Sequence, residues 1–380
     1  MTVICIRRTS FQCFDDIISL RRRQVVLVPA EKSDIMNEEQ RFHREDRTVR
    51  ITVLGAGTWG WALARLLCRR GHALTLWATT PEKADILKTT RRNPRLDDAE
   101  MPEGVRYTAD PAEACTGAEL VIFAVASAYV RTTAERMKPF LSDGQMIATA
   151  AKGIEKGTFL TMSGVLRDVL SPLNLRIAAI SGPTHAEEVA RDMPTAMVCA
   201  CTERNTAELL CDVFTDTNMR TYPCTDVEGV ELCGALKNII ALAAGMAKGL
   251  GYGDNALAAL ITRGMSEIRR LGLAMGCDGA TFDGLAGVGD LMVTCFSSHS
   301  RNMNCGVLIG GGMPPDEAIA SIGMVVEGVY ALDVAVVLAE QYAVSMPITR
   351  AVYAVLHGDA QPAEAAEYLM TRGRFLPEMK

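Results

Sequence analysis

The stretch Arg50-Ile51-Thr52-Val53-Leu54-Gly55-Ala56-Gly57-Thr58-Trp59-Gly60 decides the fold of this chain. The apolar run 51–54 is typical of a buried strand, and the G-x-G-x-x-G pattern after it opens a helical stretch over 61–70. A second apolar run over 73–77 completes a strand–helix–strand unit of the length that dinucleotide-binding folds require. A glycine-rich turn without a ligand is the alternative, but the complete unit favours a pyrophosphate site.

Each glycine of this turn has a separate expected role. Gly55 permits the tight turn, Gly57 lets the backbone approach a pyrophosphate, and Gly60 lets the helix pack closely on the strand. The phosphates would then rest on the N-terminus of the helix, where backbone N–H groups have no partner. We therefore expect residues 55–60 to bind the phosphates of a dinucleotide.

The composition of the whole chain argues against several classes of protein. A length of 380 residues suggests about two to three domains. A formal net charge of −6 argues against a nucleic-acid-binding surface. The 12 cysteines are scattered and never form C-x-x-C, which favours free thiols in a reducing cytoplasm over a disulfide framework or a metal site. No apolar run is expected to have the length of a membrane span.

Residues 1–48 do not share the pattern of the rest of the chain. They contain Arg21-Arg22-Arg23 and a mixed-charge stretch with little periodicity. A targeting peptide is one interpretation, but Asp15, Asp16 and the lack of a cleavage-like site speak against it. We favour a disordered or non-native extension, with Met36 as a candidate start.

A chain that starts at Met36 should keep the melting temperature and the kcat/KM of the full chain, because the removed segment precedes the first periodic residue, Val49. Thermal unfolding and steady-state kinetics of the two chains would test this. A melting temperature lowered by several degrees would show instead that the segment packs on the body of the protein.

From Val49 onward, apolar strand-like runs alternate with helical stretches, which predicts a Rossmann-type, doubly wound parallel sheet with helices on both faces. The predicted strands are 51–54, 73–77, 120–125, 145–149, 176–180 and 195–200. Beyond residue 226 the predicted elements are all helices: 229–249, 254–275, 301–310, 315–322, 327–342 and 348–357. We therefore divide the chain into an extension (1–48), a dinucleotide-binding domain (49–225) and an all-α substrate domain (226–380), with the active site between the last two.

Two polar segments follow predicted strands, where ligands of open α/β sheets bind. Lys152, in Ala-Lys-Gly, comes after the strand that ends at Thr149, and a solvated loop lysine is the alternative. Ser181-Gly182-Pro183-Thr184-His185 follows the strand 176–180 and places hydroxyl donors at the same edge. His185 is a candidate acid or base, but its place at a helix start favours a structural or solvent-facing role.

Lys237 is the most informative single residue. It lies beside Asn238 in a helical stretch over 230–245 that is apolar nearly all round, so both side chains need partners or water. Desolvation lowers the pKa of a lysine and lets it exchange a proton near neutral pH. Snorkelling of the side chain to the surface is the alternative, and we favour a catalytic role.

Two further groups complete the candidate site. Asp290 follows a flexible, glycine-rich approach and precedes an apolar helical turn, where it could orient the Lys237 ammonium or cap the helix. Ser300, Arg301 and Asn302 form a dense cluster of donors at a helix start, which suits a phosphate. An ordinary helix capped by Ser300 is the alternative.

Seven motifs in register give this chain a family resemblance. Gly-Ala-Gly-Thr-Trp-Gly, Ala-Lys-Gly, Ser-Gly-Pro-Thr, Ala-Leu-Lys-Asn, Gly-x-Gly-Asp-Leu, Ser-Arg-Asn and Val-Val-Glu-Gly occur in the order and spacing of the bacterial NAD(P)-dependent glycerol-3-phosphate dehydrogenases. The chain resembles that family over residues 49–372. The resemblance implies hydride transfer with NAD or NADP that interconverts dihydroxyacetone phosphate and sn-glycerol 3-phosphate, a precursor for phospholipid synthesis.

The resemblance also implies roles for individual residues. Lys237 would be the general acid/base, with Asp290 and Lys152 setting its position and charge. Substrate-binding positions are Lys152, Gly182, Thr184, Lys237, Asn238, Asp290, Ser300, Arg301 and Asn302. Cofactor-binding positions are Gly55, Gly57, Thr58, Trp59, Gly60, Lys152, Ala186, Arg301, Val325 and Glu327.

Two features depart from the family pattern. Many members have an arginine after the second strand, which contacts the 2′-phosphate of NADP, whereas here the strand is followed by Ala78-Thr79-Thr80. No Asp or Glu stands there to bind the ribose diol of NAD either, so the choice between NAD and NADP stays open. The long N-terminal extension is the second departure.

Two other functions are compatible with parts of this pattern. A β-hydroxyacid dehydrogenase would share the two-domain plan and the lysine on a helix of the second domain, but the Ser-Arg-Asn cluster favours a phosphate over a bare carboxylate. A nucleotide-binding regulator without turnover is the alternative from another class, and intact Lys237 and Asp290 argue against it. The expected partner is a small phosphate molecule rather than nucleic acid or a membrane, and a homodimer is left open.

Overall fold

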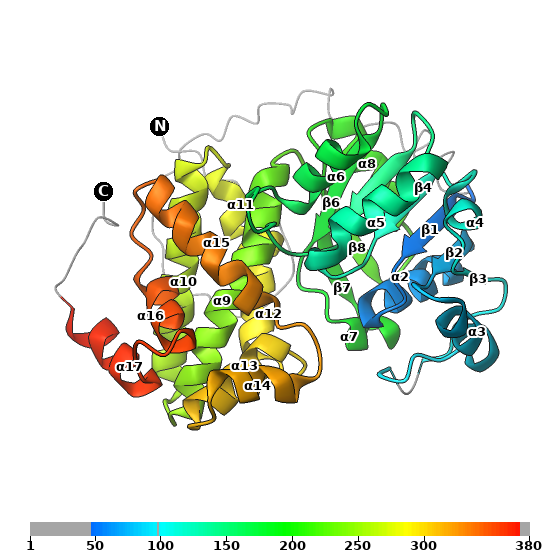
Figure 1. Ribbon diagram of the computed structural model, residues 1–380. Helices are drawn as coiled ribbons and strands as arrows, with labels where there is room; N and C mark the ends of the chain where they lie inside the picture. Colours follow the sequence, from blue (N-terminus) through cyan, green and yellow to red (C-terminus); the bar gives the residue numbers. More distant parts are fainter. Residues whose placement is uncertain (1–46, 97–98, 373–380) are drawn as a thin grey trace, which may run out of the picture. The chain divides into compact units, whose positions relative to one another are not determined.

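The computed structural model describes residues 47–96 and 99–372, which belong to one compact unit. The predicted extension therefore lies outside the described residues, apart from its last two positions. In the described part, a region built on one sheet is followed by a region of helices alone (Figure 1). This order confirms the predicted Rossmann-type sheet followed by an all-α region.

Eight strands form the sheet within the described residues, in the order β3-β2-β1-β4-β5-β6-β7-β8. The strands are β1 (Arg50–Leu54), β2 (Ala73–Trp77), β3 (Arg106–Thr108), β4 (Leu120–Phe123), β5 (Met146–Thr149), β6 (Arg176–Ser181), β7 (Thr195–Ala200) and β8 (Met219–Cys224). The strands β1 to β6 are parallel and have the order typical of dinucleotide-binding folds. Their carboxyl ends meet at one edge of the sheet, where the fingerprint turn follows β1 and Lys152 follows β5.

The sheet differs from the sequence prediction in two respects. β7 runs antiparallel to β6, and β8 is parallel to β7, so the sheet is not parallel throughout. An apolar run indicates a buried strand but not its direction, which depends on the connection before it. β3 and β8 are absent from the prediction because β3 has three residues, while β8 contains a proline and a single buried side chain, so neither forms an apolar run.

Helices cover both faces of the sheet, which explains why its central strands are apolar along their whole length. One face is covered by α2 (Thr58–Arg69), α7 (Ala186–Ala190) and α8 (Arg204–Asp212). The other face is covered by α4 (Pro111–Cys115), α5 (Val130–Met137), α6 (Met162–Leu170) and the first turn of α9 (Val227–Gly249). Successive residues of β1 alternate between the two cores, since Val53 belongs to the first and Leu54 to the second.

The helical region is organised around α9, in which residues 229–247 are all buried. The other helices are α10 (Asp254–Ala274), α11 (Gly279–Asp283), α12 (Asp290–Phe296), α13 (Arg301–Gly310), α14 (Pro315–Ile322), α15 (Glu327–Gln341), α16 (Pro347–Leu356) and α17 (Pro362–Thr371). Among the described helices, α9 alone is long and apolar enough to cross a membrane, but the stretch that meets this test is wholly buried inside the protein. This qualifies the sequence expectation about apolar length, because such burial is typical of a core helix.

α9 and α13 approach each other along a glycine seam, which we define as Gly245 and Gly249 of α9 with Gly306 and Gly310 of α13. A Cβ atom built on Gly306 would lie 2.2 Å from the Leu242 carbonyl oxygen. Backbone therefore meets backbone, and no side chain separates the two helices at this crossing. The seam holds the start of α13 beside the middle of α9.

Candidate active site

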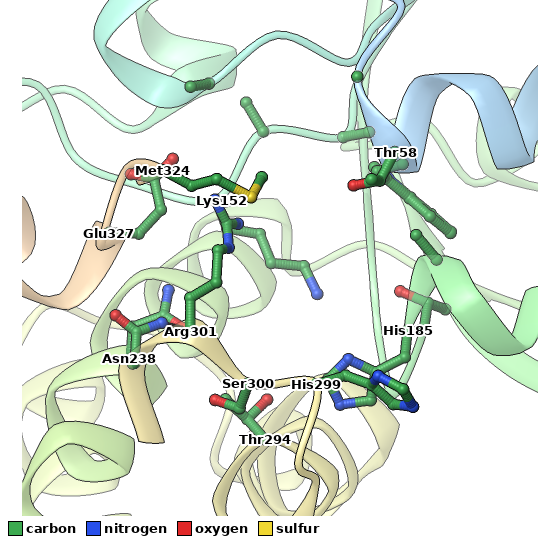
Figure 2. A pocket seen from close by; sticks show the side chains of 18 of the residues that line it. Thr58, Lys152, His185, Asn238, Thr294, His299, Ser300, Arg301, Met324 and Glu327 are labelled. Atoms are coloured by element: carbon green, nitrogen blue, oxygen red, sulfur yellow. Dashed lines mark hydrogen bonds between the residues drawn. The ribbon is translucent and has the colours of Figure 1, made fainter. Parts of the chain in front are cut away.

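A pocket of about 310 Å³ lies at the carboxyl edge of the sheet, where the sheet faces the helical region. Its walls come from the fingerprint turn, from the loops after β4, β5 and β6, and from α9, α13 and α15. Figure 2 shows Thr58 on one side of the pocket and Asn238 and Arg301 on the other. The pocket therefore joins the residues predicted to bind cofactor with those predicted to bind substrate.

The fingerprint turn has a geometry that suits phosphate binding. Gly55 has a φ of +115°, and a Cβ there would lie 2.8 Å from the Ala124 carbonyl oxygen, so glycine is required. A Cβ on Gly60 would lie 1.9 Å from the Gly55 carbonyl oxygen. Space is open in front of Gly57, and α2 begins directly after it without a side-chain cap. These residues fit a dinucleotide, because the first N–H groups of α2 can bind its pyrophosphate.

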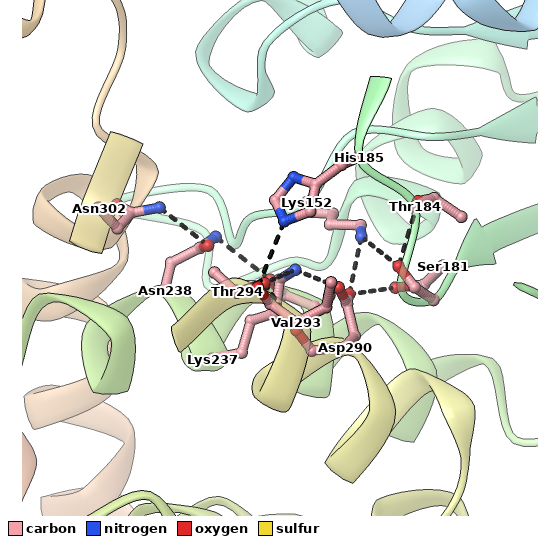
Figure 3. A network of polar contacts seen from close by, with 12 residues as sticks. Lys152, Ser181, Thr184, His185, Lys237, Asn238, Asp290, Val293, Thr294 and Asn302 are labelled. Carbon is pink, nitrogen blue, oxygen red and sulfur yellow. Dashed lines mark hydrogen bonds and ion pairs between the residues drawn. The ribbon is translucent and has the colours of Figure 1, made fainter. Parts of the chain in front are cut away.

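Lys237, Asp290 and Lys152 form one charged cluster at the inner wall of the pocket (Figure 3). The Lys237 ammonium bonds to Asp290 Oδ1 and donates to Thr294 Oγ1 at 2.7 Å. Lys152 Nζ donates to Asp290 Oδ2 at 2.7 Å and to the Gly182 carbonyl oxygen at 3.2 Å. Lys237 is 6% exposed and Asp290 1%, so the lysine does not snorkel to the surface.

Burial and ion pairing act in opposite directions on this cluster. Burial lowers the pKa of Lys237 to about 8; the Asp290 carboxylate partly offsets this effect, and the Lys152 ammonium adds to it. Burial by itself would raise the pKa of Asp290, but the two ammonium groups outweigh it and hold that pKa below its ordinary value. Asp290 therefore stays ionised, while Lys237 can exchange a proton near neutral pH.

The local structure around Asp290 explains how it reaches both lysines. A π-helical turn, Leu285–Gly289, leads directly into α12, so the glycine-rich segment is ordered helix rather than the flexible approach expected from its sequence. Asp290 is the first residue of α12, and its carboxylate bonds to the lysines instead of capping the helix. Thr294 lies one turn later on the same face and donates to the Asp290 carbonyl oxygen at 2.6 Å.

The polar side chains at the start of α13 already form several hydrogen bonds within the protein. The Ser300 hydroxyl caps α13 by accepting from the Met303 N–H at 3.2 Å, as the alternative interpretation of this residue expected. The Asn302 amide donates to Asn238 Oδ1 at 3.0 Å and accepts from the Gly328 N–H at 2.9 Å. Capping and helix packing therefore use side chains that the sequence assigned to a phosphate.

Arg301 and Glu327 bring opposite charges to another wall of the pocket. One guanidinium N–H of Arg301 donates to the Val325 carbonyl oxygen at 2.8 Å, and burial lowers the pKa of Arg301. The Glu327 carboxylate accepts from Ser127 Oγ at 2.6 Å, and burial raises the pKa of Glu327. Ser127 follows β4 and lies 200 residues before Glu327, so no local sequence signal predicts their contact.

Most of the predicted site residues line this one pocket. They are Gly57, Thr58, Trp59, Lys152, Thr184, Ala186, Lys237, Asn238, Ser300, Arg301, Asn302 and Glu327. The others lie behind its wall, where they shape turns or bond to lining residues: Gly55, Gly60, Gly182, Asp290 and Val325.

Three residues outside the predicted set belong to the site. Thr294 bonds to Lys237, and its spacing of four from Asp290 on a helix could have identified it. His185 and His299 both line the pocket. His185 Nε2 lies 3.3 Å from the Val293 carbonyl oxygen, which agrees with the structural role expected for it.

The sequence is similar to known proteins over most of its length. Residues 50–207 match the family described as NAD-dependent glycerol-3-phosphate dehydrogenase N-terminus, and residues 226–367 match the corresponding C-terminus. A glycerol-3-phosphate dehydrogenase (NAD(P)+) 2 from Lactobacillus delbrueckii subsp. bulgaricus is 50% identical over 327 residues, which are 85% of this chain and 97% of that protein. A glycerol-3-phosphate dehydrogenase (NAD(P)+) from Thermoanaerobacter sp. is 46% identical over 326 residues, 86% of this chain and 98% of that one.

A solved structure agrees with these relatives. The crystal structure of a glycerol-3-phosphate dehydrogenase from Coxiella burnetii superposes with a TM-score of 0.81 at 37% identity, covering 86% of this chain and 99% of that one. A ketopantoate reductase from Ralstonia eutropha shares the fold, with a TM-score of 0.55 at 19% identity.

Proposed function

The chain belongs to the NAD-dependent glycerol-3-phosphate dehydrogenase family, and on this premise we propose which of its residues perform the reaction. The enzyme interconverts dihydroxyacetone phosphate and sn-glycerol 3-phosphate with NAD(P)H. The dinucleotide, when bound, supplies or accepts the hydride at C2 of the substrate. The tasks left to the protein are to orient the carbonyl group, to move one proton and to hold the phosphate.

Lys237 moves the proton in this proposal. The observation that carries it is a buried ammonium at the pocket wall, held between Asp290 and Thr294. Lys237 Nζ would donate a proton to the substrate oxygen on C2 as negative charge develops there, and the neutral amine would accept it in the reverse direction. Asp290 would keep the ammonium oriented, and Lys152 would add positive charge beside the same oxygen.

The phosphate of the substrate and the pyrophosphate of the cofactor would be bound by different elements. Arg301 and the first N–H groups of α13 would hold the substrate phosphate, with Asn302 and Asn238 fixing that helix start. The fingerprint turn would hold the pyrophosphate of the dinucleotide on α2. Further substrate contacts are proposed for Gly182, Thr184 and Ser300, and further cofactor contacts for Ala186, Val325 and Glu327.

Turnover tests this function. The purified protein should oxidise NADH or NADPH only when dihydroxyacetone phosphate is present. The β-hydroxyacid dehydrogenase alternative requires comparable kcat/KM with 3-hydroxyisobutyrate and NAD(P)+, and the regulator alternative requires no turnover. Either of those results would contradict the proposed function.

The pH dependence of kcat/KM should follow the Lys237 ammonium. Reduction of dihydroxyacetone phosphate needs the protonated lysine, so kcat/KM should fall as the pH rises through about 8, where burial places the pKa of Lys237. Oxidation of glycerol 3-phosphate needs the neutral amine and should become faster over the same range. Steady-state kinetics in both directions measure these pH profiles. If kcat/KM for the reduction kept rising above that pKa, Lys237 would be excluded as the proton donor.

NADH and NADPH should both serve this enzyme, with kcat/KM values within about tenfold of each other. The reason is the end of β2, where Ala78 and Thr79 stand in place of an arginine for the 2′-phosphate or a carboxylate for the ribose diol. A bidentate phosphate contact is worth about one to two decades in affinity, and its absence removes that discrimination. Side-by-side kinetics with the two cofactors measure the ratio. A preference of roughly a thousandfold for either one would show that another group selects the cofactor.

Three broader features are also proposed. The boundaries 48/49 and 225/226 are kept as domain limits, and the second is supported by the end of β8 at Cys224 and the start of α9 at Val227. A homodimer is supported by exposed Tyr330 and Val337 on α15, and light scattering would test it. A cytoplasmic location is supported by the cysteines of the described residues, which are all free thiols, and a role in supplying phospholipid precursors is proposed from the product, glycerol 3-phosphate.

A further inference from the structure

We propose that His299 binds the substrate phosphate and thereby selects phosphorylated three-carbon substrates, a role that rests on the function proposed above. His299 comes directly before Ser300, the N-cap of α13, and lines the pocket together with Arg301 and Lys237. Figure 2 shows its imidazole ring beside that of His185, and the two ring centroids are 6.0 Å apart. The motifs that identify the family give His299 no role.

The phosphate has fewer donors at the start of α13 than the sequence suggests. The Ser300 hydroxyl accepts from the Met303 N–H as the helix cap and keeps its own O–H, while the Asn302 amide uses one N–H for Asn238 and its oxygen for Gly328. The guanidinium of Arg301, the Ser300 O–H and the first backbone N–H groups of α13 are left to bind a ligand. A phosphate dianion presents three strong acceptor oxygens, so these groups leave room for a further donor.

The His299 ring has the position of that further donor. Among the residues that the structure describes, none forms a hydrogen bond or an ion pair with this ring, which is exposed to the pocket. The backbone N–H of His299 donates to Ser297 Oγ at 3.1 Å, and this bond fixes the loop that carries the ring. An imidazole N–H one residue before the N-cap of α13 can therefore reach an oxygen of a phosphate bound there.

The surroundings of His299 favour an anion. His185 lies beside it with Nε2 at the Val293 carbonyl oxygen, and burial lowers the pKa of His185, which keeps that ring neutral. The charged residues that line the pocket are Lys152, Lys237 and Arg301, which are cationic, and Glu187 and Glu327, which are acidic, while Asp290 behind the wall is bound to the two lysines. Three cationic side chains therefore line the pocket against two acidic ones.

The test compares dihydroxyacetone phosphate with dihydroxyacetone, which lacks the phosphate. His299→Ala should lower kcat/KM for dihydroxyacetone phosphate about ten- to hundredfold, mainly through KM, because a hydrogen bond to a charged group is lost. Its kcat/KM for dihydroxyacetone should stay unchanged. Inorganic phosphate, used as a competitive inhibitor, should bind this variant more weakly by a similar factor. His299→Gln retains a neutral donor and should show a smaller loss.

Two controls make the comparison specific. The affinity for NADH, followed by fluorescence, should be the same in all variants, since the fingerprint turn is not altered. His357→Ala removes a histidine at the end of α16, outside the pocket, where its ring packs on Tyr353 at 4.0 Å between centroids. This variant should match the unsubstituted enzyme with both substrates.

Several outcomes would overturn the proposal. Equal losses with both substrates would mean that His299 acts at the carbonyl group or on the cofactor, and unchanged kinetics with both would mean that it binds nothing. A loss of affinity for NADH alone would also refute a phosphate role. If His299→Ala does not fold, as judged by circular dichroism, His299→Gln decides the question with the same pair of substrates. Failure of the unsubstituted enzyme to reduce dihydroxyacetone phosphate would refute the proposed function itself, so the two failures are distinguishable.

Discussion

Replacing Lys237 with alanine should lower kcat for the reduction of dihydroxyacetone phosphate at least about a thousandfold. A positioned proton donor contributes about a hundred- to ten-thousandfold to a rate. The same ammonium would also stabilise the alkoxide that forms on C2, and its removal should add to the loss. The contacts of Lys237 with Asp290 and Thr294 hold the donor in one orientation, so the alanine variant loses both the proton and its placement. Steady-state kinetics at saturating substrate measure the effect.

The affinity for NAD(P)H shows whether Lys237→Ala loses activity through the chemistry or through a change of structure. The affinity for NAD(P)H should change little in Lys237→Ala, because the turn from Gly55 to Gly60 lies on the sheet and Lys237 on α9. Lys237→Met keeps the volume of the side chain and should be as inactive as the alanine variant. Arg301→Ala should differ from both by raising KM for the phosphate substrate as well. If Lys237→Ala kept more than about a tenth of the original kcat, the lysine would be a structural residue.

Asp290→Ala should impair both activity and stability. Asp290 bonds to Lys237 and Lys152 at once, so its removal leaves two ammonium groups near each other without their shared counter-charge. Removing one partner of a buried ion pair costs about 3–5 kcal/mol in the free energy of unfolding. Repulsion between the lysines should also lower the pKa of Lys237 further and reduce its protonated fraction at neutral pH. We expect kcat to fall by about a hundredfold or more, together with a lower melting temperature.

A double variant, and a control variant at another buried carboxylate, test this explanation. Lys237→Met combined with Asp290→Ala removes one of the two uncompensated charges and should be more stable than Asp290→Ala alone. Glu231→Gln alters another buried carboxylate of the helical region, one that accepts from the Ser163 N–H at 2.8 Å instead of binding a lysine. It should lower stability without moving the pH profile of kcat/KM. A normal kcat in Asp290→Ala would contradict the role of the carboxylate.

Several of the elements that the sequence predicted correctly are buried on all sides. β1, β4 and β5 lie between two layers of helices, and α9 is enclosed by its neighbours, so each leaves a continuous apolar run. The edge strand β3 and the proline-containing β8 leave no such run. The direction of β7 could not be predicted either, because a run of apolar side chains has the same pattern in a parallel and in an antiparallel strand.

Some residues of the site could be assigned from their local sequence, whereas others depend on contacts between distant segments. Lys152 follows β5 and Lys237 lies in an apolar helix, and these local contexts were enough to assign both to the candidate site. The contact of Ser127 with Glu327 depends on how segments 200 residues apart meet, which no motif encodes. The hydrogen bonds of Asn302 to Asn238 and Gly328 could not be predicted for a related reason. An amide at a helix start can bind a ligand or a neighbouring helix equally well.

The glycine seam between α9 and α13 bears on the length of substrate that the enzyme accepts. Lys237 on α9 would meet the oxygen on C2, while the start of α13 would hold the phosphate, so the crossing of the two helices sets the distance between those groups. Because backbone contacts backbone at Gly306, this distance is fixed by the main chain and cannot be adjusted by a change of rotamer. A homologous keto-phosphate with one more carbon between its carbonyl and phosphate groups could therefore occupy only one of the two positions at a time. Discrimination by chain length would thus originate in a contact that touches neither ligand.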